Sequence, residues 1–462
     1  MTQVRKAVFI ALVVAEVAAQ YAKVDFAKDV LGALAVSCWI LALGPADRTS
    51  RRISLALVAV GSLVFIRSGA TLRQAVESFS ENTNVLMVMV LIPLLGVVVD
   101  LGGYADALSV ASRNVTKPLN LYVLSMLLAF AIGSVLLNAS IALLWVVLHP
   151  VAERSRDDPQ WFLVKCLPRG YNASLLWTPS SPSTAVALGV TGAMWTRIAG
   201  PGFAMSLAML AVAVLLEKDY LTARPERSST EKDRPGESDG PKPVDAEERH
   251  NASLKLAALG TGLLSFIVSI VALEALGVTI YQAVLPCVLG TALIWGTLIR
   301  KGREAAVGLV KRLNASMAGM STQFLLMTTA GFIGTAVKLA TAGGLAAYLS
   351  GVAANPTLFA FLMSFLVVIL SILGIHPQIG MVIVYSLFSS VAGSYPPHFV
   401  ALALMLGAAL GYNVSPVSAT MLVTSSCAKT NTIEVGVKRH WKHALVVLPL
   451  GTLILRALVQ VR

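Results

Sequence analysis

Two stretches of the sequence place polar side chains, glycines and prolines inside segments that are otherwise strongly apolar. They cover residues 136–145 and 170–184. An unpaired backbone group costs several kcal/mol in a hydrocarbon environment, so irregular backbone persists at membrane depth only where it is buried in protein or lines a cavity. We therefore predict that these two stretches form a binding site.

Similar stretches occur in the same order in the C-terminal half of the chain. Residues 375–380 stand where 137–142 stand, and the Gly-Tyr-Asn-Val-Ser sequence at 411–415 repeats the Gly-Tyr-Asn-Ala-Ser sequence at 170–174. Two interrupted segments at corresponding positions in both halves indicate the binding site of a transporter built from an internal repeat.

The side chains at these interruptions are hydroxyls and amides. Free N–H groups at the start of a helix attract anions, and free carbonyl groups at its end attract cations. Together with the neutral oxygen atoms of these side chains, such helix ends suit the binding of an anion and a hard cation such as Na⁺. The candidate ligands are Asn138, Ser140, Asn172, Ser174, Thr178, Ser180, Ser181 and Ser183 in one half, and Gln378, Asn413, Ser415, Ser418 and Thr420 in the other.

Each of these residues also has a structural interpretation, because Ser, Thr and Asn commonly bond across packed membrane helices. Ionisable residues inside apolar runs are few, and His376 is the one at an interruption. It could bind an anionic group or carry a coupled proton, or it could serve as a neutral hydrogen-bonding group. Glu16, Asp100 and Glu274 lie near the predicted ends of helices or in the unpaired first helix, which suits interfacial side chains.

The composition defines the class of protein. The chain has 462 residues, of which 56% are apolar and 13% charged, whereas soluble proteins carry about 25% charged residues. It is therefore predicted to be a polytopic protein of the inner (plasma) membrane, with the lipid bilayer as its surroundings. The net charge of +12 is attributed to basic cytoplasmic loops and not to nucleic-acid binding.

The four cysteines lack the spacing of a disulfide framework or a metal site. We expect no cofactor, and no metal beyond a transported Na⁺. Clustered His, Cys or carboxylates, which an integral-membrane enzyme would need, are missing, so we expect no enzymatic activity. A phosphate-binding Gly-Lys-Ser/Thr loop is also missing from the sequence, which disfavours an ATP-driven pump.

Apolar runs of about 20 residues, the length that crosses a bilayer, predict about eleven spans in total. The runs lie at 7–22, 30–45, 53–69, 85–102, 170–190, 199–217, 253–274, 276–299, 318–340, 397–426 and 441–459. Two longer runs, 118–152 and 355–393, contain polar interruptions and are predicted to be re-entrant helix–turn–helix hairpins.

The predicted fold is all-α, with an inverted repeat of about five spans plus one re-entrant hairpin in each half. Most basic residues fall on one side if the N-terminus is cytoplasmic, as the positive-inside rule requires. The same plan makes the two hairpins enter from opposite sides. The predicted divisions are 1–29 as an extra N-terminal helix, 30–217 and 253–462 as the repeats, and 218–252 as a disordered cytoplasmic linker.

The arrangement resembles the ion transporter superfamily, which includes divalent-anion/sodium symporters, citrate carriers and arsenite permeases. Asn138-Ala139-Ser140 resembles the Ser-Asn-Thr type of hairpin tip, and Thr-Pro-Ser and Ser-Pro-Val-Ser stand at the breaks. The resemblance implies that residues 138–140, 178–181, 376–378 and 413–418 hold substrate and Na⁺. It thereby adds Ala139, Pro179, Pro377 and Pro416 to the candidates. The second hairpin departs from the pattern, because it has His-Pro-Gln at its tip.

The function predicted is secondary active transport of a small, preferably organic, anion coupled to Na⁺ or H⁺. A Na⁺/H⁺ antiporter is the first alternative, but it would need a buried carboxylate, and no Asp or Glu lies in a hairpin or break. An arsenite-type efflux permease and an integral-membrane enzyme are the others. The oligomeric state stays open, with a homodimer among the options.

Overall fold

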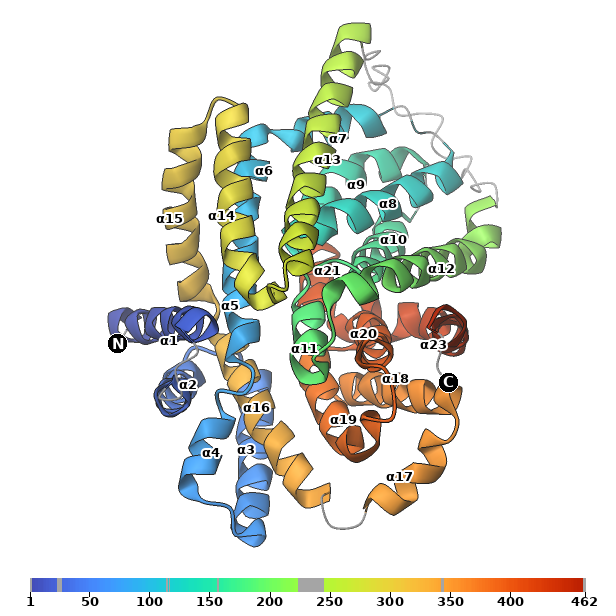
Figure 1. Ribbon diagram of the computed structural model, residues 1–462. Coiled ribbons are helices and arrows are strands. Elements are labelled where there is room, and N and C mark those ends of the chain that lie inside the picture. The colour runs from blue at the N-terminus through green and yellow to red at the C-terminus, as the bar shows by residue number, and fades with distance from the viewer. Residues whose placement is uncertain are drawn as a thin grey trace.

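The computed structural model describes residues 2–22, 27–113, 115, 117–155, 158–222, 245–341 and 345–459 (Figure 1). All regular elements in these residues are helical, and 9 of the helices are long and apolar enough to cross a membrane. The protein is an all-α polytopic membrane protein, as its composition predicts.

The helices of the N-terminal half are α1 (Thr2–Ala22), α2 (Ala27–Leu43), α3 (Arg48–Ser68), α4 (Leu72–Ser78), α5 (Thr83–Leu91), the 3-10 turn η1 (Ile92–Leu95), α6 (Gly96–Gly102), α7 (Tyr104–Ser112), α8 (Pro118–Leu136), α9 (Ala139–Ser155), α10 (Pro159–Ser174), α11 (Pro182–Thr191) and α12 (Trp195–Thr222).

The helices of the C-terminal half are α13 (Ala246–Ala275), α14 (Ile280–Leu298), α15 (Gly302–Gly319), α16 (Ser321–Thr341), α17 (Leu345–Ala353), α18 (Pro356–Ile372), α19 (Pro377–Ala392), α20 (Pro397–Val414), α21 (Ala419–Cys427), α22 (Thr432–Val435) and α23 (Val437–Leu458).

Both predicted hairpins are interrupted where the sequence places the polar residues. Helix α8 ends at Leu136 and α9 begins at Ala139, while α18 ends at Ile372 and α19 begins at Pro377. The chain turns through Leu137 and Gly374, whose φ angles are 52° and 91°. A positive φ is unusual for leucine and marks a backbone that its surroundings hold in place. The depth and side of entry of the hairpins stay predictions.

The other two predicted breaks are also present. Helices α10 and α11 are separated at residues 175–181, and α20 and α21 at 415–418. Helix α10 begins at Pro159, however, well before the apolar run predicted at 170–190. The length of this helix was underestimated from sequence because Lys165 and Arg169 interrupt the apolar run. Both side chains are packed inside the protein and pair with Glu217.

The predicted linker 218–252 is wrong at both ends. Helix α12 continues to Thr222 and α13 begins at Ala246. The first extension is held by packing, because Glu217 and Leu221 are buried against the rest of the protein. Residues 223–244, the remainder of the predicted linker, lie outside the described residues.

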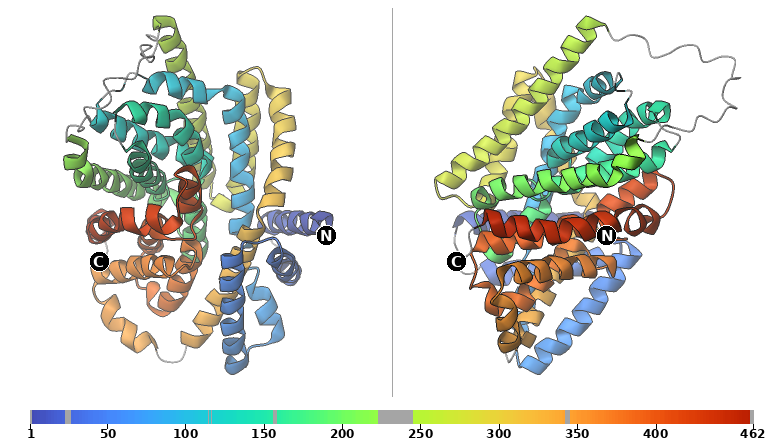
Figure 2. Two further views of the ribbon diagram at one scale, coloured as in Figure 1. Left: turned by 180° about the vertical axis from the view of Figure 1, so that it is seen from behind. Right: turned by 90° about the vertical axis from the view of Figure 1, so that its right-hand side faces the viewer.

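The two sequence halves interdigitate. Helices α1–α6 lie with α14–α16 on one side of the molecule, and α8–α12 lie with α18–α23 on the other (Figures 1 and 2). Helix α3 packs against α16, and α10 against α20. A buried hydrogen bond of 2.6 Å joins Ser54 Oγ in α3 to Thr329 Oγ1 in α16. Each side of the molecule therefore contains helices from both halves, while the inverted relation between the halves stays a prediction.

The glycine of the first Gly-Tyr-Asn sequence allows α10 to approach α8 closely. A Cβ atom at Gly170 would lie 2.2 Å from the carbonyl oxygen of Met126 and 3.0 Å from Ala129 Cβ. Because the nearest atom belongs to a helix backbone, the two helices would have to separate. Gly170→Ala should therefore destabilise the protein by about 1–3 kcal/mol, the usual cost of overpacking.

Thermal unfolding in detergent would measure this loss. Gly260→Ala is the matched control, because Gly260 lies within α13 and a Cβ there would meet nothing within 4 Å. We expect the control to be neutral or slightly stabilising, since alanine favours the helix. Equal melting temperatures for the two variants would show that α8 and α10 are not in tight contact.

Candidate functional site

Asparagine side chains from the two halves meet in the buried interior of the protein. Asn172 in α10 donates from Nδ2 to Asn413 Oδ1 in α20 at 2.9 Å, and both side chains are fully buried. Thr420 Oγ1 in α21 can donate to Asn138 Oδ1 at 3.0 Å or to Asn172 Oδ1 at 3.2 Å. Four polar residues from the two halves of the chain thus form one hydrogen-bonded group.

A cavity of about 540 Å³ lies beside this group. Its lining includes residues at the starts of six helices, each within the first turn of the helix or immediately before it. The lining residues at these positions are Arg48 of α3, Asn138 before α9, Ser183 of α11, Thr322 of α16, Gln378 of α19 and Ala419 of α21. The first N–H groups of a helix have no partner within it, and the aligned peptide dipoles place about half a positive charge there. Positive ends of six helices therefore border the cavity, together with the ends of α10, α15 and α20 at Leu175, Gly319 and Tyr412.

Some of these helix starts are capped by predicted site residues. Ser181 Oγ accepts a hydrogen bond from the Ser183 N–H at 3.1 Å, and Ser418 Oγ accepts one from the Met421 N–H at 3.2 Å. No side chain caps α19, which follows His376. The serines stabilise α11 and α21, whereas the start of α19 keeps uncapped N–H groups for other partners.

Three buried polar atoms without a hydrogen-bond partner belong to residues that line the cavity. They are Ser183 Oγ, Gln323 Oε1 and His376 Nδ1. A buried polar atom without a partner costs about 1–3 kcal/mol, and such atoms in native proteins require an explanation. A bound polar solute would satisfy these groups.

The charged residues of the cavity stand at its exposed mouth. Asp47 Oδ1 accepts a hydrogen bond from the Ser50 N–H at 2.8 Å and so caps α3, and Asp47 Oδ2 lies 3.3 Å from Thr322 Oγ1. Arg48 is exposed beside it and lines the same cavity. Deeper inside, the His376 ring packs edge-on against Tyr412, with 5.6 Å between the ring centroids.

The remaining predicted site residues lie at the breaks and mostly bond to nearby backbone. Ser140 Oγ donates to Leu137 O and Ser174 Oγ to Tyr171 O, both at 2.7 Å. Thr178 Oγ1 donates to Ser134 O at 3.2 Å and lies 2.7 Å from Ser180 Oγ. Asn138, Ser183, His376, Gln378 and Pro416 line the cavity. The other predicted site residues are not among its lining residues, namely Ala139, Ser140, Asn172, Ser174, Thr178, Pro179, Ser180, Ser181, Pro377, Asn413, Ser415, Ser418 and Thr420. Their part in binding stays a prediction.

Sequence reasoning did not identify the contribution of α3 and α16 to the cavity. Arg48 looked like an ordinary basic residue flanking a span, and Thr322 and Gln323 belong to the run at 318–340, which was predicted only as a membrane span. The polar sequence Ser-Thr-Gln at 321–323, which opens an apolar run, was the available signal.

A buried ionic cluster was also missed. Arg169 in α10 is only 2% exposed. Its Nη1 lies 3.0 Å from Glu217 Oε1 and 3.0 Å from Tyr122 Oη, and its Nε donates to His440 Nδ1 at 3.3 Å. Lys165 Nζ lies 2.8 Å from Glu217 Oε2. Two cations thus share one carboxylate where α8, α10, α12 and α23 meet, one helical turn before Asn172.

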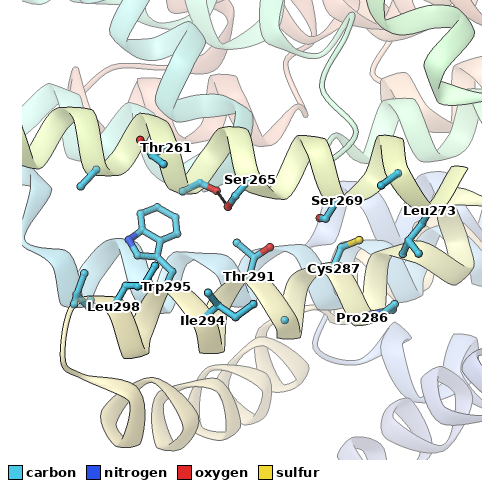
Figure 3. Close-up of a pocket in the computed structure, with 15 residues that line it drawn as sticks. Thr261, Ser265, Ser269, Leu273, Pro286, Cys287, Thr291, Ile294, Trp295 and Leu298 are labelled. Atoms are coloured by element: carbon cyan, nitrogen blue, oxygen red, sulfur yellow. Dashed lines mark hydrogen bonds between the residues drawn. The ribbon is translucent and has the colours of Figure 1, made fainter. Parts of the chain in front are cut away.

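The larger groove between α13 and α14 has a different character (Figure 3). It encloses about 700 Å³ and is lined mainly by apolar residues such as Trp295 and Ile294. Two of its serines bond to the helix backbone, since Ser265 Oγ donates to Gly262 O at 2.8 Å and Ser269 Oγ to Phe266 O at 2.7 Å. This mainly apolar groove suits a polar solute less well than the cavity beside Asn138, so it is not the candidate site.

No protein-family model matches the sequence, and no curated protein matches it. The solved structures that are similar in fold include two transporters. The YdaH transporter of Alcanivorax borkumensis is 14% identical with a TM-score of 0.53, over 83% of this chain and 86% of that one. MtrF of Neisseria gonorrhoeae, from a class of antimetabolite efflux pumps, is 14% identical with a TM-score of 0.55, over 87% and 94%.

This chain therefore has the fold of two membrane transporters. At 14% identity the similarity establishes the fold alone. The two structures do not single out the ion transporter superfamily that the motifs resemble.

Proposed function

We propose that this protein is a secondary transporter that moves a small organic anion across the membrane. The observation that carries the proposal is the meeting of six helix starts at one cavity. Such starts favour negative charge, and their N–H groups bind anions directly. The fold shared with two transporters supports the same function.

The size and polarity of the cavity suit a small organic molecule. Its volume of about 540 Å³ lies in the range of roughly 300–1,000 Å³ that is usual for small-molecule sites. The unpartnered atoms of Ser183, Gln323 and His376 offer directional hydrogen bonds. Arg48 at the mouth supplies a cation that would attract an anionic solute.

The lining favours symport over Na⁺/H⁺ antiport. Among the described residues that line the cavity, Asp47 is the only carboxylate, and it caps α3. Antiport would need a carboxylate that is free to exchange ions. Na⁺ or H⁺ would therefore travel with the anion. Efflux is the second candidate direction, since MtrF, which shares the fold, is described as an antimetabolite efflux pump.

Purified protein in liposomes would test the proposal. A panel of labelled mono-, di- and aromatic carboxylates would be offered under separately imposed Na⁺ and proton gradients. We expect at least one anion to accumulate above equilibrium with one of the gradients and not in protein-free liposomes. Failure of every anion to respond to either gradient would contradict the proposal.

His376→Gln distinguishes the two roles of this histidine. Glutamine keeps a neutral hydrogen-bonding group but cannot titrate. Because His376 Nδ1 is buried at the cavity without a protein partner, we expect it to act as a hydrogen-bonding ligand, so that transport and its pH dependence both persist. Uptake measured from pH 5 to pH 8 would check this (the range in which histidine normally titrates). A flattened pH profile would instead assign the coupled proton to His376.

A further inference from the structure

A second, much smaller cavity lies farther along three of the helices that line the first. It encloses about 80 Å³. Gly189 of α11, Thr335 of α16 and Ser386 of α19 line it, and the charged residues Glu81 and Lys338 stand at its exposed rim. Its lining is mainly polar or glycine, which is unusual for a space between transmembrane helices.

The two cavities are separated by a thin layer of protein. On α19, Gln378 lines the large cavity and Val382 the small one, which corresponds to about 6 Å at the helical rise. On α11, the corresponding residues are Ser183 and Gly189, about 9 Å apart by the same rise. The two cavities are therefore separated by about one to two helical turns along these helices.

The helices around this layer are in very close contact. A Cβ atom at Gly334 in α16 would lie 2.7 Å from Val382 Cγ1 in α19, and one at Gly331 would lie 2.5 Å from the carbonyl oxygen of Ser78. Glycine in a helix interior costs stability, so these positions indicate a need for close approach. Small shifts of α19 relative to α16 would open or close a connection between the two cavities through this layer.

The cavities lie at opposite ends of α16, which is long and apolar enough to span a membrane. Thr322 in its first turn lines the large cavity, and Lys338 in its last turn lines the small one. Helix α3 runs parallel beside it, since Asp47 contacts Thr322 and a Cβ at Gly61 would contact Phe332. Figures 1 and 2 show both helices leading away from the centre of the molecule. The exposed residues of the two cavities therefore lie toward opposite ends of α16.

We propose that the small cavity is the other end of the solute pathway, closed in this structure by the layer between α11, α16 and α19. The proposal rests on the transport function proposed above. Lys338 then attracts the anionic solute at this end of the pathway, as Arg48 does at the large cavity. Its Nζ lies 6.0 Å from the centre of the Tyr385 ring, at the rim of the small cavity.

Thiol reactivity tests the pathway. Ser386→Cys replaces a small side chain of the small cavity, and Val384→Cys places a thiol on the same helix at a buried position that lines neither cavity. The probe is a negatively charged methanethiosulfonate reagent, with labelling of the parent chain subtracted. We expect Ser386→Cys to react at least tenfold faster than Val384→Cys. Equal rates would overturn the proposal.

Charge selectivity tests the role of Lys338. In the Ser386→Cys background, Lys338→Gln should lower the rate of the anionic reagent relative to a cationic one severalfold, whereas Lys338→Arg should not. An unchanged ratio would overturn the assignment of this end to an anion. Labelling needs no known solute, so it is independent of the uptake assay. Anion uptake with an unreactive Ser386→Cys would refute the pathway alone, and absence of uptake would refute the transport function.

Discussion

Asn138→Asp should abolish anion transport while leaving the protein folded. Aspartate has almost the shape of asparagine, and its oxygen can still accept the hydrogen bond from Thr420. It adds a negative charge to a cavity that we propose holds an anion. At 4 Å and an effective dielectric constant of about 20, two like charges repel by about 4 kcal/mol. Uptake in liposomes should therefore fall by at least a hundredfold.

Asn355→Asp is the matched control for this variant. Asn355 caps α18 by accepting hydrogen bonds from the N–H groups of Thr357 and Leu358. Aspartate caps a helix as well as asparagine does, so this variant should transport normally. If Asn138→Asp also transported the anion at the normal rate, the solute would have to bind elsewhere.

Glu217→Gln should strongly destabilise the protein. Glu217 is the carboxylate that both Arg169 and Lys165 contact, and Arg169 is almost completely buried. Removing one partner of a buried ion pair typically costs about 3–5 kcal/mol, because it leaves an uncompensated charge. The melting temperature in detergent should fall by many degrees, and expression should fall with it.

Glu434→Gln provides the comparison for an exposed pair. Glu434 lies 2.6 Å from Lys438, one turn along the surface, and exposed pairs contribute little to stability. We expect an almost unchanged melting temperature. A comparable loss in both variants would mean that the Arg169–Glu217 pair is no more important than a surface contact.

The interruptions of the helices could be predicted from sequence because they obey local rules. Proline, glycine and polar residues destabilise a membrane helix unless the protein around them satisfies the freed polar groups. This reasoning placed the turn between α8 and α9 and the break after Asn413 correctly. The repeated Gly-Tyr-Asn sequence also marked Asn172 and Asn413 as corresponding candidates in the two halves, and the structure joins them by a direct hydrogen bond.

The rest of the site depends on contacts between distant segments. Arg48 and Gln323 lie at the starts of helices with ordinary flanking sequences, and only the packing of α3 against α16 brings them to one cavity. In the sequence, Arg169 looks like a basic residue that flanks the apolar run at 170–190. Arg169 can be buried because Glu217 in α12 pairs with its charge. No local sequence pattern predicts that pair.

Solute protection of a thiol in the large cavity tests the central claim most directly. Ser183→Cys places a thiol at one of the unpartnered cavity atoms, and Ser253→Cys places one on the exposed start of α13. Once uptake has identified a transported anion, a saturating concentration should slow labelling of Ser183→Cys by the anionic methanethiosulfonate reagent at least tenfold, without affecting Ser253→Cys. Labelling of Ser183→Cys at the same rate with and without the transported anion would contradict the assignment of this cavity as the binding site.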